Sequence, residues 1–342
     1  MYHIEKEIKS QFSSITKTVD YISGRRDEIS GFFDKTKIRF IGSGSSFYLA
    51  QSASLFFGLN NDGFDTYAVT AGDLLLNFDK YKDFFNDSIV VCLTRSGSTT
   101  ELTRCLELLN DIECKKIAVC ARKNAKSSAL CDMNLEIEWA FDESVCQTQT
   151  VTNIYSACLA ISAVISNNNS LIDELRSLKK HAEAFRENYE KTLMEIGENR
   201  VWNNAVTLAD CECSGLLMEG ALAFMEICQD RASFYNVLDV RHGPIVLIDE
   251  KTLVLVLVNA NNNENKDLIS DIKGRGAFCI TAGMFADELG GDIHLELPHL
   301  NNISVAAVLA QYAIHIITLS RALEKGIDPD NPSGLNSWVE LA

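Results

Sequence analysis

Short apolar runs alternate with amphipathic stretches along the first half of the chain. Runs rich in β-branched residues predict strands, and apolar residues spaced three or four apart predict helices. Strands are expected near 37–41, 88–93, 116–120 and 135–139, and helices near 2–23, 46–57, 99–111 and 148–165. Strands that alternate with helices are typical of a parallel sheet covered by helices.

The same order of elements recurs in the second half. Strands are expected near 204–209, 252–258, 277–281 and 293–296, and helices near 215–228, 265–274 and 303–325. Three asparagines at 167–169 interrupt the pattern, and 170–195 has the composition of one long charged helix. We therefore predict an α/β fold of two domains, each a parallel sheet flanked by helices, divided as follows: 1–27 N-terminal helix, 28–166 first domain, 167–196 connecting helix, 197–325 second domain, 326–342 tail.

A turn crowded with hydroxyl groups follows the second predicted strand and reads Thr94-Arg95-Ser96-Gly97-Ser98-Thr99-Thr100-Glu101. The N–H groups and dipole of the helix start, together with several hydroxyl donors, favour a phosphate dianion, and Gly97 lets the backbone approach it. Arg95 adds a candidate cation. The alternative is a simple helix cap, although a cap needs only one hydroxyl. Neither a Walker sequence nor G-x-G-x-x-G is present, so a nucleotide is not the favoured ligand.

A second turn of small polar residues, Gly42-Ser43-Gly44-Ser45-Ser46, follows the first predicted strand. Open α/β sheets bind ligands at the carboxyl ends of their strands. We therefore expect this turn to lie beside the 94–101 turn, at the carboxyl ends of neighbouring strands. The corresponding loop of the second half, Asn259–Asn265, lacks serines, so we expect one phosphate site in the chain.

A carboxylate pair and a histidine mark the second half. Glu219 and Glu226 are two turns apart on one face of a predicted helix, and His242 follows sixteen residues after Glu226. Pro244 fits the first turn of a helix and Gly243 frees the backbone, so His242 should lie at a rigid boundary. The layout is that of a proton-transfer site. The alternative is an ordinary amphipathic helix followed by a histidine that caps or packs.

These motifs together resemble the sugar isomerase (SIS) domain family, which includes the isomerase half of glucosamine-6-phosphate synthase. The resemblance covers nearly all of the chain and rests on GSGSS at 42–46, TRSGSTTE at 94–101, ESVCQTQT at 143–150, EGALAFME at 219–226, RHGP at 241–244 and GIDPDNP at 326–332. It implies two flavodoxin-like domains, each a three-layer sandwich of a parallel sheet between helices.

The resemblance also implies roles for individual residues. The expected phosphate ligands are Thr94, Arg95, Ser96 and Thr99, and the expected sugar contacts are Ser46, Gln147, Thr148 and Glu219. Glu226 would be the base that moves a proton between C1 and C2, whereas Glu219 would also orient its helix. His242 would open the sugar ring, and in the synthase the corresponding histidine comes from the neighbouring subunit.

Departures from the synthase narrow the expected activity. Ala223 stands where the synthase has a lysine, and the 334–340 tail offers no counterpart of its catalytic lysine. Because the chain begins Met1-Tyr2-His3 and goes straight into the first predicted helix, we expect no amidotransferase domain. We expect a phosphosugar isomerase that acts on a hexose or aminohexose 6-phosphate by aldose–ketose proton transfer, with deamination left open. A fructosamine-6-phosphate deglycase and a non-catalytic sugar-phosphate-binding protein are the alternatives. No cofactor is expected, because the adjacent carbonyl or iminium acidifies the proton.

Composition bears on the partners and the compartment. The 342 residues carry a net charge of −16, which argues against nucleic acid as a partner. Eleven cysteines in apolar or helical contexts favour a reducing, cytoplasmic compartment, and Cys211-x-Cys213 lacks further ligands at zinc-site spacing, so no metal is expected. No signal sequence is visible, and no apolar run is expected to reach the roughly 20 residues that a membrane helix needs. The expected partners are a small phosphosugar and further copies of the chain, in a homodimer or a higher homo-oligomer.

Overall fold

The computed structural model describes residues 1–199, 202–258 and 260–341. Residues 200 and 201 of the predicted second domain, Asn259 of the predicted Asn-rich loop and Ala342 of the predicted tail lie outside the described residues. The chain divides into two compact units. The first unit contains residues 9–179 and 336–342, and the second contains residues 1–8 and 180–335. Helices α1 (His3–Gly24) and α8 (Asn169–Asn199) each contribute residues to both units.

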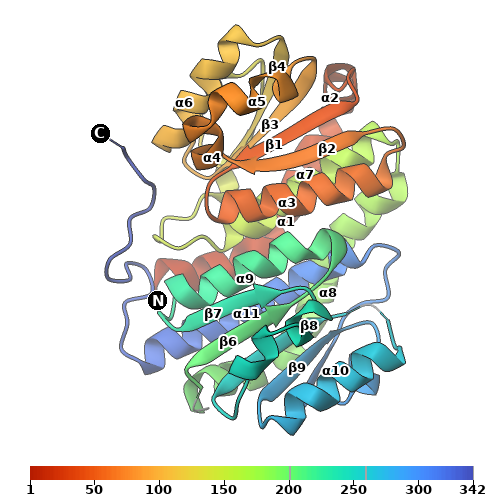
Figure 1. Cartoon of the computed structure of the whole chain (residues 1–342), viewed down its shortest axis with the longest axis vertical. Coiled ribbons are helices and arrows are strands. Elements are labelled where there is room, and N and C mark those ends of the chain that lie inside the picture. The colour runs from red at the N-terminus through yellow and green to blue at the C-terminus, as the bar shows by residue number, and fades with distance from the viewer. Residues whose placement is uncertain (200–201, 259, 342) are drawn as a thin grey trace. The chain divides into compact units, whose positions relative to one another are not determined.

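The first unit contains a five-stranded parallel sheet in the order β2-β1-β3-β4-β5. Its strands are β1 (Lys37–Gly42), β2 (Asp65–Thr70), β3 (Ser88–Thr94), β4 (Cys114–Cys120) and β5 (Met133–Glu136). One face is covered by α3 (Ser45–Asn60) and α7 (Gln149–Ile165), and the other by α4 (Ala71–Leu76), α5 (Phe78–Phe85) and α6 (Thr100–Leu108) (Figure 1). Helix α2 (Arg26–Phe32) packs on α7. Buried Val90, Cys92, Leu102 and Leu106 join β3 to α6.

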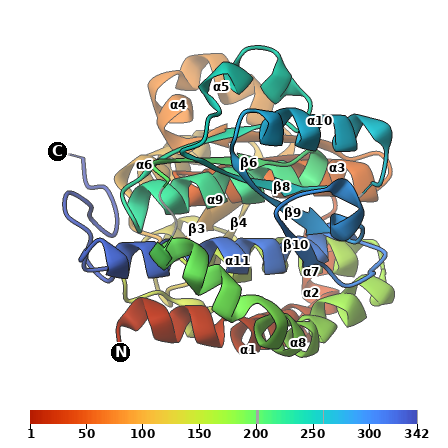
Figure 2. The same cartoon turned by 90° about the horizontal axis from the view of Figure 1, so that it is seen from below.

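The second unit contains another five-stranded parallel sheet, in the order β10-β9-β8-β6-β7. Its strands are β6 (Asn204–Leu208), β7 (Arg231–Tyr235), β8 (Thr252–Leu257), β9 (Phe278–Gly283) and β10 (Ile293–Glu296). Helices α9 (Ser214–Glu226) and α11 (Ile303–Glu324) cover one face, and α10 (Asn263–Gly274) covers the other, which faces the viewer in Figure 2. Val254, Val256, Leu268 and Ile272 join the sheet to α10.

The two sheets have the same topology. In each half, the second strand lies outside the first, and the third, fourth and fifth follow on the other side. This is the flavodoxin-like order, whose switch point lies between the first and third strands. The switch points are therefore between β1 and β3 in the first unit and between β6 and β8 in the second. The predicted fold class, two α/β domains with a parallel sheet between helices, is confirmed.

The edge strands β2 and β7 were missed by the sequence prediction, together with the short helices α4 and α5. Both strands occupy the same place in their sheets, next to the first strand. Most of their side chains are half-buried or exposed, whereas every residue of β3 and β8 is buried. An edge strand that faces solvent lacks the continuous apolar run that identifies a central strand.

Several predicted boundaries shift in the structure. Strand β5 ends at Glu136 rather than near 139, because its pairing with β4 ends there and residues 138–140 form a 3₁₀ turn. Helix α6 ends at Leu108, and 109–111 form another 3₁₀ turn. The expectation about long apolar runs was wrong for α11: among the described residues it is the one helix long and apolar enough to cross a membrane. Its apolar window is 94% buried within the protein, as expected of a core helix.

Candidate functional site

The two hydroxyl-rich turns follow neighbouring strands of the first unit. Strands β1 and β3 pair in parallel, with Ile38 opposite Ile89 and Ile41 opposite Cys92. Their carboxyl ends therefore lie at the same edge of the sheet, where β1 runs into the 42–46 turn and β3 into the 94–99 turn. The predicted adjacency of the strands is confirmed, and the turns flank the switch point of this sheet.

The 94–99 turn requires glycine at its centre. Gly97 has a φ of +61°, and a Cβ atom there would lie 2.4 Å from Cβ of Ala125 and 2.6 Å from Oγ of Ser127. Two hydroxyls shape the turn: Thr94 Oγ1 accepts from the Gly97 N–H at 3.0 Å, and Ser96 Oγ accepts from the Ser98 N–H at 3.2 Å. Thr99, the N-cap residue of α6, makes no side-chain cap. The alternative of a simple hydroxyl cap at Thr99 therefore does not describe this helix start.

Arg95 is buried, with 4% of its surface exposed. Its Nη1 donates to the carbonyls of Ser144 and Val145, both at 2.9 Å, and Nη2 donates to the carbonyl of Ser337. The guanidinium thus links the 94–99 turn to the 143–148 loop and to the C-terminal segment of the same unit. The three carbonyls therefore engage N–H donors of Arg95, a residue that is predicted from the sequence to bind phosphate.

The C-terminal segment lies along the start of α6. The Thr100 N–H donates to the Val339 carbonyl at 3.3 Å, and the Leu341 N–H donates to Thr100 Oγ1 at 3.1 Å. The Trp338 ring lies beneath the guanidinium of Arg122, whose Cζ is 5.9 Å from the ring centroid. The sequence carries no periodic signal for this placement, because the segment has no regular secondary structure and bonds to residues more than 200 positions away.

The 42–46 turn is equally tight. Gly44, at a φ of +55°, is the N-cap residue of α3, and a Cβ at Gly42 would lie 2.6 Å from the backbone carbon of Ser46. Ser46 itself is buried in the first turn of α3. The Ser43 hydroxyl is buried and has no hydrogen-bond partner among the described residues. A buried hydroxyl without a partner is unfavourable, so Ser43 is a candidate ligand residue that the sequence analysis did not single out.

Asp142 organises the third loop of the first unit. Its buried carboxylate accepts from the N–H groups of Thr148, Gln149 and Thr150 at 2.8, 3.2 and 3.0 Å, which satisfies the start of α7. The Thr148 hydroxyl is fully buried and lies 3.4 Å from the same carboxylate, whereas Gln147 is only half-buried. Asp142 could not be identified from the sequence, because it lies six residues before Thr148 rather than at the usual N-cap position.

In the second unit, Glu219 and Glu226 have different surroundings. Glu219 is 1% exposed and accepts a hydrogen bond from Nε2 of Gln311 on α11. The same Nε2 lies 3.1 Å from Nε2 of His315, a fully buried histidine whose pKa is lowered to about 3 by burial. Glu226 ends α9 and is half-buried. One carboxylate is thus enclosed between two helices, and the other is accessible to solvent.

His242 lies at the rigid boundary that the sequence predicts. Its N–H donates to the Asp239 carbonyl at 2.9 Å, and its side chain is exposed. Gly243 has a φ of +128°, and Pro244 begins the 3₁₀ turn Pro244–Leu247. The preceding residue, Arg241, pairs with Asp271 of α10, with Nη2 and Oδ2 2.7 Å apart.

The switch point of the second sheet has a different lining. A cavity of about 480 Å³ lies there, and its wall includes Asp210, Cys211, Glu212 and Glu264. Three carboxylates disfavour a phosphate dianion. This lining differs from the hydroxyl-rich turns at the switch point of the first unit, and the single phosphate site stays a prediction.

Comparisons with known proteins agree with these motifs. No protein-family model matches the chain. It is 25% identical over 354 residues to the glutamine–fructose-6-phosphate aminotransferase of Sulfurisphaera tokodaii, covering 98% of this chain and 56% of that protein. It is 24% identical over 361 residues to the D-galactosamine-6-phosphate deaminase AgaS of Escherichia coli, covering 96% and 91%. The chain thus spans about half the length of the aminotransferases and nearly all of AgaS.

Solved structures share the fold at low sequence identity. Tagatose-6-phosphate ketose/aldose isomerase from Escherichia coli matches with a TM-score of 0.86 and 20% identity, covering 99% of this chain and 96% of that one. Glucosamine-6-phosphate deaminase from Thermotoga maritima matches with a TM-score of 0.77 and 22% identity, covering 95% and 100%. The resemblance found in the motifs is confirmed: the homologues of the chain include the isomerase domains of glucosamine-6-phosphate synthase and AgaS, and its structural neighbours are sugar-isomerase-domain proteins, which matches a double sugar-isomerase-domain family.

Proposed function

We propose that this protein is a phosphosugar isomerase that acts on a hexose or aminohexose 6-phosphate by aldose–ketose proton transfer. One observation carries the proposal: the strand order of the first unit sets the hydroxyl-rich turns after β1 and β3 at the switch point, where open α/β sheets bind ligands. The match to AgaS along nearly the whole of both chains supports an aminohexose substrate that loses its amine as ammonia.

Each motif has one task in the proposed mechanism. The phosphate is bound by backbone N–H groups and by Ser96 and Thr99, rather than chiefly by Arg95. His242 opens the sugar ring, and Glu226 removes a proton from one of C1 and C2 and returns it to the other. The neighbouring carbonyl or iminium makes this proton acidic, so that a positioned base typically accelerates the transfer by about 10²- to 10⁴-fold.

The remaining predicted residues support the substrate or the base. Ser46 and Gln147 are proposed sugar contacts, and Gln147 is the stronger candidate of the Gln147–Thr148 pair because the Thr148 hydroxyl is buried against Asp142. Glu219 is proposed to orient α9, since its carboxylate accepts from Gln311 at the centre of a helix contact. A proton-transfer role suits the half-buried Glu226 better than the enclosed Glu219.

We also propose that the enzyme is a cytoplasmic homodimer or higher homo-oligomer. The exposure of His242 supports this, because a histidine that acts in a neighbouring subunit must project from its own. The free state of all eleven cysteines supports a reducing compartment.

The test of the proposal is isotope exchange at C1 and C2. In heavy water, NMR follows exchange in galactosamine 6-phosphate, glucosamine 6-phosphate and tagatose 6-phosphate, while separate assays follow ammonia and ketose formation. Glu226→Gln keeps the size of the side chain but not its basicity, so exchange should fall by about 10²-fold or more while ligand affinity stays within about twofold. Glu219→Gln is the matched control and should have a smaller effect.

The outcomes separate the candidate functions. Exchange with ammonia release identifies a deaminase, and exchange with ketose formation alone identifies an isomerase. Exchange at the native rate in Glu226→Gln protein removes Glu226 as the base. Binding without exchange for every phosphosugar identifies a sugar-phosphate-binding protein, and release of an amino acid from a fructosamine 6-phosphate identifies a deglycase.

A further inference from the structure

We propose that a cavity over strands β6 and β7 of the second unit is an additional ligand site, separate from the phosphate turn, for a small hydroxyl-rich ligand with one anionic group. The cavity has a volume of about 520 Å³. Small-molecule sites in proteins typically measure about 300–1,000 Å³.

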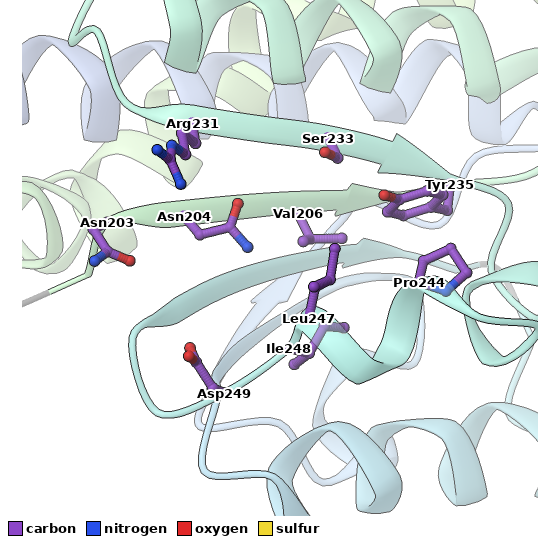
Figure 3. A pocket seen from close by; sticks show the side chains of 10 residues that line it. All are labelled: Asn203, Asn204, Val206, Arg231, Ser233, Tyr235, Pro244, Leu247, Ile248 and Asp249. Atoms are coloured by element: carbon purple, nitrogen blue, oxygen red, sulfur yellow. The ribbon is translucent and has the colours of Figure 1, made fainter.

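The pairing of the two strands builds one wall of the cavity. Asn204 lies opposite Arg231 and Val206 opposite Ser233, so that alternate residues of both strands share one face. Thr207, which points to the other face, donates its hydroxyl to the Leu217 carbonyl of α9. The cavity is therefore on the face that α9 does not cover. Figure 3 shows Arg231, Ser233 and Tyr235 along β7, above Asn204 and Val206 of β6.

The opposite wall comes from the segment that follows His242. Pro244, Leu247 and Ile248 supply apolar surface there, and Asp249 lies at one end (Figure 3). The Asp249 carboxylate already accepts from the Lys251 N–H and the Thr252 hydroxyl, both at 3.0 Å. Its charge is therefore partly satisfied within its own turn, and its remaining lone pairs can accept from sugar hydroxyls.

Five polar side chains in the lining are available to a ligand: Asn203, Asn204, Arg231, Ser233 and Tyr235. Across the parts of the chain that the structure describes, none of these five side chains has a hydrogen bond or an ion pair to another protein group. By contrast, the guanidinium groups of Arg95, Arg241 and Arg321 each bond to protein carbonyls or carboxylates. The cavity therefore holds donors that the fold does not use.

The arrangement of these groups defines the class of ligand. A guanidinium beside two amides recognises a carboxylate or a phosphate through charge-assisted hydrogen bonds. The Ser233 and Tyr235 hydroxyls lie farther along β7 and suit sugar hydroxyls, while Val206 and Ile248 offer apolar surface to the C–H groups of a ring. Because the chain carries a net charge of −16, an anion is held here by direct contact with Arg231 rather than by long-range attraction.

The test begins with the full chain carrying Ser96→Ala and Thr99→Val, which disables the proposed phosphate turn. Calorimetric titration with glucose 6-phosphate and glucuronate compares the two anionic groups, and glucose is the neutral reference. We expect both anions to bind, and glucose to bind about tenfold more weakly or worse. Adding Arg231→Gln should lower the affinity for both anions by roughly tenfold or more, because a charge-assisted hydrogen bond is lost. The affinity for glucose should stay unchanged.

Two further variants locate the site. Arg275→Gln removes an equal charge from an exposed residue that does not line the cavity and should change no affinity. Asn204→Asp places a carboxylate next to Arg231 and keeps the arginine. It should lower the affinity for both anions. Equal affinities in the Arg231→Gln and Arg275→Gln proteins, or no binding of either anion, would overturn the proposal. If the 94–99 turn does not bind phosphate, the native and Ser96→Ala/Thr99→Val proteins will bind glucose 6-phosphate with equal affinity. Arg231→Gln will still weaken that binding. The two proposals therefore fail in different ways.

Discussion

At the residue scale, the hydrogen bonds of Arg95 limit its part in the proposed phosphate site. The side chain lies in the predicted turn, but its guanidinium donates to the carbonyls of Ser144, Val145 and Ser337. Breaking those bonds would be costly, because the Ser144 carbonyl is buried and the other two are partly buried. Phosphate affinity should therefore come mainly from the hydroxyls of Ser96 and Thr99 and from N–H groups at the start of α6 other than that of Thr100, which donates to the Val339 carbonyl.

Replacing these two hydroxyls tests that explanation. In Ser96→Ala/Thr99→Val protein, phosphosugar affinity should fall by several kcal/mol, since each charge-assisted hydrogen bond contributes roughly 1.5–3 kcal/mol. Helix α6 should stay folded, because Thr99 makes no side-chain cap. Calorimetric titration with glucosamine 6-phosphate measures the change. Thr103→Val, which removes a hydroxyl from the next turn of the same helix, is the control, and equal affinities in the two variants would exclude the turn as the anchor.

At the element scale, α9 and α11 form a close helix pair around a buried polar cluster. Gly220 permits the approach, since a Cβ there would lie 2.4 Å from Cδ1 of Ile314. Three buried polar side chains meet at this contact: Glu219, Gln311 and His315. Because Glu226 is on α9, the cluster helps to fix the helix that carries the proposed base.

The buried histidine makes the stability of this pair depend on pH. The pKa of His315 is about 3 in the folded chain, against an ordinary value of 6.5, so the folded state holds the neutral form and the unfolded state binds a proton first. Its contribution to stability is complete above pH 6.5 and is lost as the pH falls toward 3. Between pH 7.5 and 5.5, the native protein should lose about 1.4 kcal/mol more free energy of unfolding than His315→Gln protein.

Urea denaturation followed by circular dichroism at the two pH values measures this difference. The control is His299→Gln protein, in which an exposed histidine is replaced in the same way. The same pH dependence in native and His315→Gln proteins would show that His315 is protonated without cost in the fold.

At the scale of the whole molecule, one topology occurs twice with different chemistry at its switch point. The first sheet carries serine and threonine there, and the second carries three carboxylates around a cavity. The proposed base and the ring-opening histidine both come from the second unit. Because His242 is exposed and the resemblance to the synthase implies a histidine that serves the neighbouring subunit, we expect each proposed active site to need two copies of the chain.

A mixing experiment tests this shared site. Glu226→Gln and His242→Ala proteins should each be inactive, but subunit exchange between them creates hybrid dimers with one intact site. Random exchange of equal amounts should restore about a quarter of native activity, since half of the dimers are hybrid and each has one of two sites. Exchange is verified by mass spectrometry of differently tagged chains. Verified exchange without recovered activity would show that both residues act within one subunit.

Local patterns in the sequence were sufficient to predict the central strands and the main turns. Apolar runs predicted β1, β3, β4, β6 and β8 to within about two residues, because the periodicity of a buried strand or helix depends on neighbours only a few positions away. Gly97, Gly243 and Pro244 could be interpreted in the same way, because their backbone requirements are local. The hydroxyl-rich turns and the histidine boundary therefore follow from the sequence alone.

The tertiary structure decided the features that depend on distant residues. It paired Arg95 with the 144–145 carbonyls and with Ser337, placed Asp142 at the start of α7, and enclosed Glu219 rather than Glu226. It also defined the edge strands β2 and β7 and, over β7, the cavity beside Arg231. No local period encodes such contacts, because they arise when packing brings together residues that are far apart in the chain.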